Sequence, residues 1–123
     1  MMVSVQQSKE RIRAQTRRMS LERELERWLP LLIAHEDPDK IILFGSYCND
    51  QVSEWSDLDM VIIKETQARF LDRTRRILAL LKPRVGIDVL VYTPQEFEQL
   101  RQKRAFVRNE IDAKGKVIYE RAS

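Results

Sequence analysis

The stretch of sequence that decides the fold is residues 41–63, IILFGSYCNDQVSEWSDLDMVII. It opens with a short apolar run that ends in a Gly-Ser pair, and an Asp-Leu-Asp triplet leads into a second apolar run. Short apolar runs bounded by glycine or polar residues are typical of buried strands. The sequence therefore predicts strands over residues 40–44 and 57–63, joined by a polar loop.

The two ends of this loop carry the residue types of a phosphate and metal site. Gly45 allows a ligand to approach the backbone closely, and Ser46 with the amides after it can hold phosphate oxygens. Asp57 and Asp59 stand two residues apart on a strand, so they project to one face and can share a divalent cation. Asp88, in the next predicted strand, can add a third carboxylate to that face.

The ligand chemistry of these carboxylates favours one class of metal. Three oxygen donors without a nearby His or Cys suit Mg²⁺, with Mn²⁺ as an alternative, rather than zinc. Two such ions can activate an attacking oxygen and stabilise a leaving pyrophosphate. The pattern thus predicts a two-metal site that acts on nucleotide phosphates.

The rest of the chain alternates helices with strands. Periodicity and capping signals predict a helix from Ser20 with a kink or restart at Pro30, followed after the two strands by helix 67–81, strand 85–92, helix 93–104, helix 106–112 and strand 116–119. Phe70, Leu71, Thr74, Ile77, Leu78 and Leu81 form the expected buried face of helix 67–81. We expect a single α/β (α+β) domain around a small mixed sheet flanked by helices.

The N-terminal segment differs in composition from the rest of the chain. Residues 1–19 are polar, with Val5, Ile12 and Met19 seven residues apart, and we expect either a helical arm or a flexible tail. The globular domain is predicted to span residues 20–123.

Length, charge and cysteine content exclude several classes. A chain of 123 residues fits one domain, its net charge is +3 with a pI near 9.2, and its single cysteine excludes an internal disulfide. Residues 41–64 hold one basic residue against four acidic ones, and residues 86–100 hold three acidic residues and no basic one. Acidity concentrated around the predicted site disfavours nucleic acid as a partner. No apolar run is long enough to span a membrane and no signal-peptide pattern is seen, so we expect a cytoplasmic protein.

The motifs around the predicted site resemble those of a known family. Leu-Phe-Gly-Ser ending at Ser46, a ten-residue gap, Ser-Asp-Leu-Asp-Met at 56–60 and Gly-Ile-Asp-Val-Leu at 86–90 look like the nucleotidyltransferase domain of the DNA polymerase β superfamily. The short length is similar to its minimal nucleotidyltransferase (MNT) branch, which often pairs with a small helical HEPN protein as antitoxin and toxin. The resemblance covers about residues 20–120 and implies a polymerase β-like nucleotidyltransferase fold.

The resemblance also implies residue roles. Gly45 and Ser46, with Tyr47 beside them, would bind the triphosphate of ATP, Asp57 and Asp59 would hold two Mg²⁺ ions, and Asp88 would complete the site as metal ligand or general base. The implied reaction transfers AMP to a hydroxyl acceptor, and that acceptor is expected on a HEPN-type partner. One departure stands out, because relatives commonly continue with an Ala-Arg-Gly-like segment where this chain has Cys-Asn-Asp at 48–50.

Alternatives remain open from the sequence. The departure favours a non-catalytic antitoxin that neutralises a helical partner by contact, and adenylylation of a small molecule such as an aminoglycoside is a third reading. Tyr47 either contacts nucleotide or packs, Trp55 either anchors its loop or contacts a base, and Trp28 is expected in the core. Self-association is left open.

Overall fold

The computed structural model describes residues 4–122 and contains a four-stranded mixed sheet. The elements in chain order are α1 (Val5–Glu36), β1 (Lys40–Phe44), β2 (Leu58–Ile63), α2 (Phe70–Leu81), β3 (Ile87–Tyr92), α3 (Pro94–Lys103), the π-helix η1 (Val107–Ala113) and β4 (Lys116–Glu120). The strand order is β3-β2-β1-β4, with β2 and β3 parallel and the other two pairings antiparallel. This confirms the predicted α/β class.

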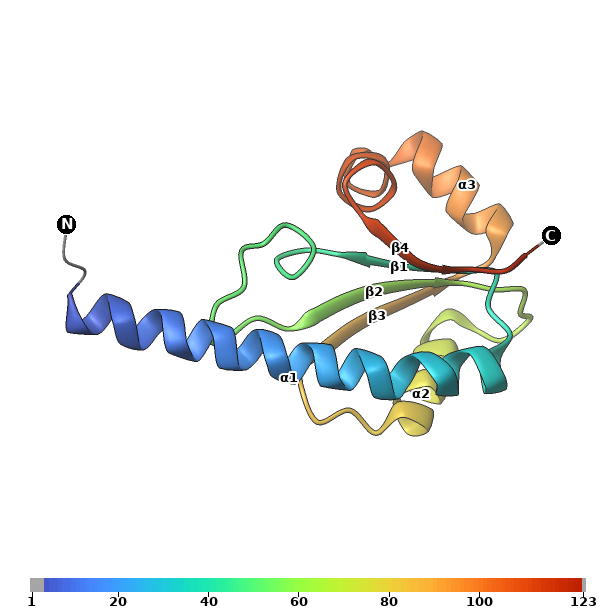
Figure 1. The fold of residues 1–123 in the computed structure, drawn as a ribbon. Coiled ribbons are helices and arrows are strands. Elements are labelled where there is room, and N and C mark those ends of the chain that lie inside the picture. The colour runs from blue at the N-terminus through green and yellow to red at the C-terminus, as the bar shows by residue number, and fades with distance from the viewer. Residues whose placement is uncertain (1–3, 123) are drawn as a thin grey trace.

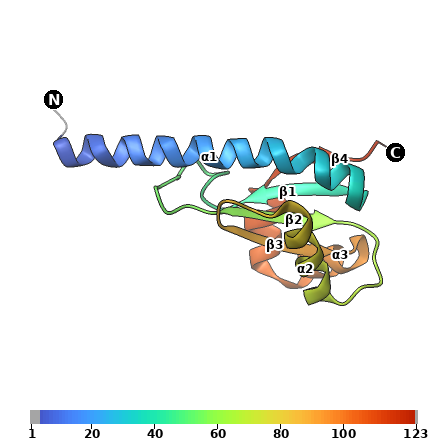
Figure 2. The ribbon, with the colours of Figure 1, turned by 90° about the horizontal axis from the view of Figure 1, so that it is seen from below.

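Helices cover both faces of the sheet (Figures 1 and 2). On one face α1 and α2 pack on alternate residues of β2, and the cluster there includes Trp28, Leu32, Leu58, Met60 and Ile77. On the other face α3 and η1 pack on the intervening positions, and that cluster includes Phe44, Val61, Ile63, Phe97 and Ile111. Trp28 is fully buried, as the sequence predicts.

Helix α1 differs from its prediction. It runs without interruption over 32 residues and begins after Ser4, which forms a capping box with Gln7. The predicted start at Ser20 is wrong, because the Ser20 hydroxyl bonds the Thr16 carbonyl instead of capping a new helix. The helix also continues through Pro30, whose missing backbone donor removes only one bond from a helix held by packing on either side.

Helix α2 is less buried than predicted. Ile77 and Leu81 face the core, whereas Phe70, Leu71 and Leu78 are 38%, 65% and 36% exposed. The apolar periodicity is present, but only a narrow stripe of this helix meets the sheet and α1. The predicted burial of these three side chains is therefore wrong.

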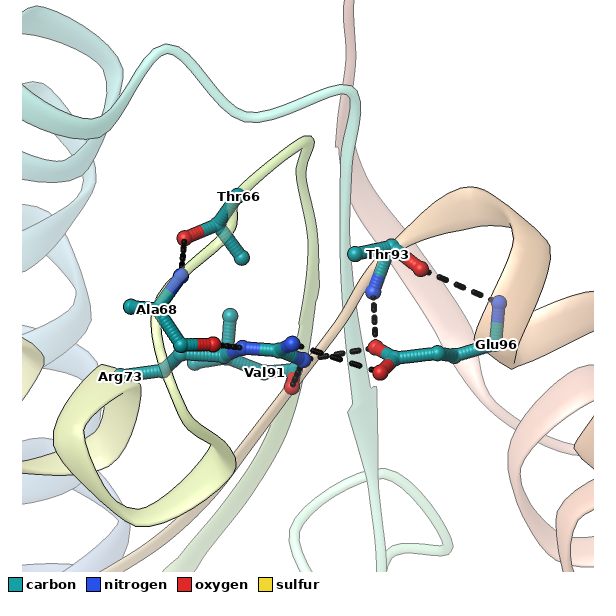
Figure 3. Close-up of polar contacts among 6 residues, drawn as sticks. All are labelled: Thr66, Ala68, Arg73, Val91, Thr93 and Glu96. Carbon is teal, nitrogen blue, oxygen red and sulfur yellow. Dashed lines mark hydrogen bonds and ion pairs between the residues drawn. The ribbon is translucent and has the colours of Figure 1, made fainter.

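A polar cluster joins α2 to α3 around the end of β3 (Figure 3). Thr93 and Glu96 form the predicted capping box at the start of α3. Arg73 donates to both carboxylate oxygens of Glu96, at 2.6 and 3.3 Å, and to the carbonyls of Val91 and Ala68 at 3.2 and 2.8 Å. The hydrogen bond from Arg73 is the main reason that the pKa of Glu96 lies below its usual range.

We predict that Glu96→Gln lowers the free energy of unfolding by about 1 kcal/mol at pH 7, because Arg73 then loses a charged partner. Since the folded state lowers the pKa of Glu96, the stabilisation is present above the ordinary pKa of a glutamate and disappears as the pH falls through the lowered value. Urea denaturation at pH 7 and pH 3 measures this. An equal deficit at both pH values would contradict the ion-pair explanation.

Candidate active site

The predicted carboxylates gather at one end of the sheet. In the strand register, Phe44 of β1 lies opposite Asp59 of β2, and Asp59 lies beside Asp88 of β3. Gly45 follows β1 directly and Asp57 precedes β2 directly. The sheet therefore brings Gly45, Asp57, Asp59 and Asp88 to the same end of its strands, although 43 positions separate Gly45 from Asp88.

Asp59 is the most enclosed of the three carboxylates. Its side chain lies on the face of the sheet that α3 and η1 cover further along, while Asp57 and Asp88 are exposed. Burial raises the pKa of Asp59, and the negative charges of Asp88 and Asp57 raise it further. Negative charge is thus concentrated at this end of the sheet. Within residues 4–122, Asp57 forms an ion pair whereas Asp59 and Asp88 form none.

Two glycines make room for the two aspartates of the Asp-Leu-Asp triplet. Gly45 has φ +81°, and a Cβ there would lie 2.1 Å from Oδ2 of Asp59. A Cβ at Gly86 would lie 2.1 Å from Oδ1 of Asp57. Both carboxylates therefore rest against bare backbone. Sequence reasoning gave Gly86 no role, although its place two residues before Asp88 is a signal that could have been read.

Asp57 has a partner that the sequence did not indicate. Arg17 of α1 donates through Nη2 to Oδ1 of Asp57 at 3.2 Å and through Nε to the carbonyl of Ser56 at 2.7 Å. The pair joins residues 40 positions apart. No local pattern marks Arg17, because only the path of α1 past the β1–β2 loop brings it there.

The loop after Gly45 is held by a compact set of bonds. The Gly45 carbonyl accepts the amides of Cys48 and Asn49, each at 3.1 Å. The hydroxyl of Ser46 donates to the Oγ of the buried Ser56 at 3.1 Å. These bonds fix where the chain turns after β1 and bring Ser46 back to the residue that precedes Asp57.

Tyr47, Cys48 and Trp55 of this loop differ in how far their side chains are buried. Tyr47 packs against the core cluster under α1, and burial is the main cause of its raised pKa. Trp55 is 81% exposed, so it does not anchor the loop. The Cys48 thiol is half-buried and lies 3.7 Å from the Lys114 carbonyl.

The carboxylates have the oxygen donors that a hard divalent cation requires, but their side chains are not arranged around one point. Within residues 4–122, no three His, Cys, Asp or Glu side chains converge closely enough to hold one ion together. Asp59 and Asp88 are register neighbours, whereas Asp57 is turned toward Arg17. The donors are all oxygen, and a cation would relieve the repulsion that raises the pKa of Asp59. The donor chemistry therefore suits a hard cation such as Mg²⁺, whereas the three carboxylates do not converge in this arrangement.

The family of the chain follows from its sequence as a whole. The family model for polymerase β nucleotidyltransferases matches residues 26–123. The chain belongs to this family. The matched region contains the last third of α1 and every element after it, which includes the whole sheet and all three carboxylates.

A solved structure shows the same fold. A protein from Sulfolobus solfataricus, described as a candidate nucleotidyltransferase in its crystal structure at 1.40 Å, superposes with a TM-score of 0.62 at 12% identity. The alignment covers 89% of this chain and 88% of that protein. No curated protein matches the sequence significantly. Across residues 4–122, no helix is both long and apolar enough to cross a membrane.

We predict that Asp59→Asn raises the free energy of unfolding at pH 7 in EDTA, because it removes a carboxylate whose pKa burial and like charges have raised. The gain should shrink as the pH falls through the raised pKa of Asp59, since protonation removes the same charge. Urea denaturation compares it with Glu65→Gln, which removes a charge from an exposed position outside the site. A destabilised Asp59→Asn protein would contradict the repulsion described above.

We predict that Gly86→Ala displaces Asp57 and weakens Mn²⁺ binding about tenfold, because the new methyl group occupies the place of the carboxylate. Electron paramagnetic resonance of free Mn²⁺ measures the affinity, and circular dichroism checks that the sheet is intact. Ala122→Gly, at an exposed position near the C-terminus, is the control for a change of the same size. Unchanged Mn²⁺ affinity in Gly86→Ala would show that the position of Asp57 does not matter.

Proposed function

We propose that the protein is a Mg²⁺-dependent nucleotidyltransferase that transfers AMP from ATP to a hydroxyl group. The observation that supports this most directly is the placement of Asp59 beside Asp88 and against Gly45, where carboxylates and bare backbone meet at one end of the sheet. A nucleotide phosphate needs both features, since backbone amides bind its oxygens and carboxylates bind its metal.

Each side chain has a role in this proposal. Gly45 and Ser46 hold the triphosphate, with the Ser46 hydroxyl exchanging its bond to Ser56 for a phosphate oxygen. Asp57 and Asp59 hold two Mg²⁺ ions, and Asp88 joins them or takes the proton of the acceptor hydroxyl. When bound, the two ions neutralise charge on the attacking and leaving oxygens. The acceptor oxygen attacks the α-phosphorus, the bond to the β-phosphate oxygen breaks, and pyrophosphate leaves.

The proposed acceptor lies on a small helical protein of the HEPN type, with this chain as its antitoxin. Three exposed apolar side chains of α1, Val5, Ile12 and Met19, are spaced seven residues apart and are 72%, 63% and 47% exposed. Seven-residue spacing places them in one line along the helix, which suits contact with another helix. At 3.6 residues per turn this line lies on the side of α1 away from the buried Leu21 and Trp28, so a partner docked there would reach the carboxylates only by extending around the helix.

A second candidate is a non-catalytic antitoxin that acts by contact alone. The ion pair between Arg17 and Asp57 favours it, because an arginine already occupies one oxygen of a proposed metal ligand. This candidate predicts tight partner binding without use of ATP, and its neutralising effect would survive the loss of Asp57 and Asp59.

We predict that the protein, given Mg²⁺, α-labelled ATP and the product of its neighbouring gene where that product is a helical HEPN-type protein, labels that product and releases pyrophosphate. The Asp57→Ala/Asp59→Ala variant should lose both signals by at least about a hundredfold, since the metal ligands are gone. Glu65→Gln should retain them. Equal labelling by the double variant would refute the metal mechanism, and neutralisation without any labelling by wild type would select the contact candidate.

A further inference from the structure

The loop that joins β1 to β2 contains no cation of its own. Residues 45–63 include four acidic residues and no Lys or Arg. A nucleotide triphosphate brought to Gly45 and Ser46 would therefore add negative charge to a segment that is already negative. Any basic side chain that meets it has to come from another element.

The first half of α1 supplies such side chains. Figures 1 and 2 show this part of the helix running alongside the β1–β2 loop. Arg13 lies 3.7 Å from Glu54, and Arg17 bonds Ser56 and Asp57 as described. Arg18 donates to Oδ1 of Asp50 at 2.6 Å, and its guanidinium carbon lies 5.4 Å from the centre of the Tyr47 ring.

The two partners of the Arg18–Asp50 pair are held very differently. The Arg18 side chain is 31% exposed and rests on the aromatic ring of a residue packed in the core. The Asp50 side chain is 92% exposed and stands on a residue with φ 57° in the left-handed region. An exposed carboxylate contributes little to stability through such a pair, whereas a phosphate group binds a guanidinium through stronger, charge-assisted bonds. A phosphate group can therefore replace Asp50 at the Arg18 guanidinium without moving the guanidinium.

We infer that Arg18 is a phosphate-binding residue of the nucleotide site and that Asp50 occupies its guanidinium until a nucleotide triphosphate displaces it. The inference rests on the proposed function and adds a binding residue from outside the β1–β2 loop. Arg18 thereby provides from α1 the positive charge that residues 48–50 lack. Tyr47 acts through Arg18, since its ring holds the guanidinium beside the turn that begins at Gly45.

Two substitutions should change nucleotide affinity in opposite directions. Arg18→Gln should weaken Mg²⁺·ATP binding about tenfold, because a charge-assisted bond to phosphate is lost. Asp50→Asn should strengthen it about threefold, because the competing anion is gone. Both changes in affinity should be smaller for AMP, because AMP carries one phosphate group instead of three. If the pair served only to hold the loop in place, both substitutions would weaken binding.

The experiment is isothermal titration calorimetry with Mg²⁺·ATP and with AMP, at one fixed salt concentration. Arg23→Gln is the control for Arg18→Gln, since Arg23 is exposed on the same helix and forms no ion pair within the described residues. Glu65→Gln is the control for Asp50→Asn. In the Arg18→Gln/Asp50→Asn double variant the gain from Asp50→Asn should vanish, because Asp50 acts only through Arg18.

The outcomes separate this inference from the proposed function. If wild type and both controls bind Mg²⁺·ATP but Arg18→Gln binds as tightly as Arg23→Gln, the inference is wrong and the proposed function stands. A weakening of binding by Asp50→Asn would also overturn it. If wild type does not bind Mg²⁺·ATP at all, the proposed function fails and the inference fails with it.

Discussion

The burial of the central strand β2 on both faces is the constraint on which the other elements depend. Five of its six residues are buried, and Asp59 is the exception. Helices α1 and α2 cover one set of its side chains, and α3 and η1 cover the other. Since the apolar side chains of such a strand cannot be left in water, the helices must lie where they do. The one position that they leave partly open is the position of a carboxylate.

Helix α1 is fixed to this core by buried polar contacts as well as by apolar packing. Glu24 accepts the Arg84 amide at 3.0 Å, and Arg27 donates to the Leu81 carbonyl at 2.8 Å, so α1 ties down the end of α2 and the start of the path to β3. Near its other end the buried Glu36 receives Lys64 at 3.1 Å and Arg76 at 3.0 Å. Buried carboxylates tolerate little displacement of their partners. The rotation of α1 about its axis is therefore set well away from the site.

That rotation decides which side chains of α1 reach the β1–β2 loop. Helical residues four apart share a face, so Arg13 and Arg17 point to the same side, and Arg18 projects about 100° further round the helix to another part of the same loop. With the helix held at Glu24 and Glu36, this basic face meets the most acidic loop of the chain. The continuous course of α1 through Ser20 matters for the same reason, because a break there would separate the arginines from the anchor at Glu24.

The sequence predicts the strands well, because strands depend on local patterns, and the strands bring Asp57, Asp59 and Asp88 to one end of the sheet. Apolar runs bounded by glycine identify β1 and β2. The pattern places Asp57 and Asp59 on one strand, whereas Asp57 lies just before β2 and pairs with Arg17 of α1. The sequence misjudges α1 and α2 where the outcome depends on distant packing: Ser20 has the composition of a cap but lies inside a longer helix, and Leu71 follows the helical period but finds no partner. Arg17 carries no sequence signal, since its role depends on a residue 40 positions away.

The carboxylates and the arginines near this end of the sheet come from different elements. The carboxylates belong to the strands or directly precede them, and the arginines belong to α1. Carboxylates that bind a cation must be close together, and the parallel register of β2 and β3 achieves this with Asp59 and Asp88. Cations on those same strands would neutralise the carboxylates. Placing the arginines on α1 keeps them within reach of the loop but outside the row of carboxylates that crosses the sheet. One end of the sheet thus carries the negative charge and the neighbouring half of α1 carries the positive charge, and the net charge of +3 is the sum of such opposed regions.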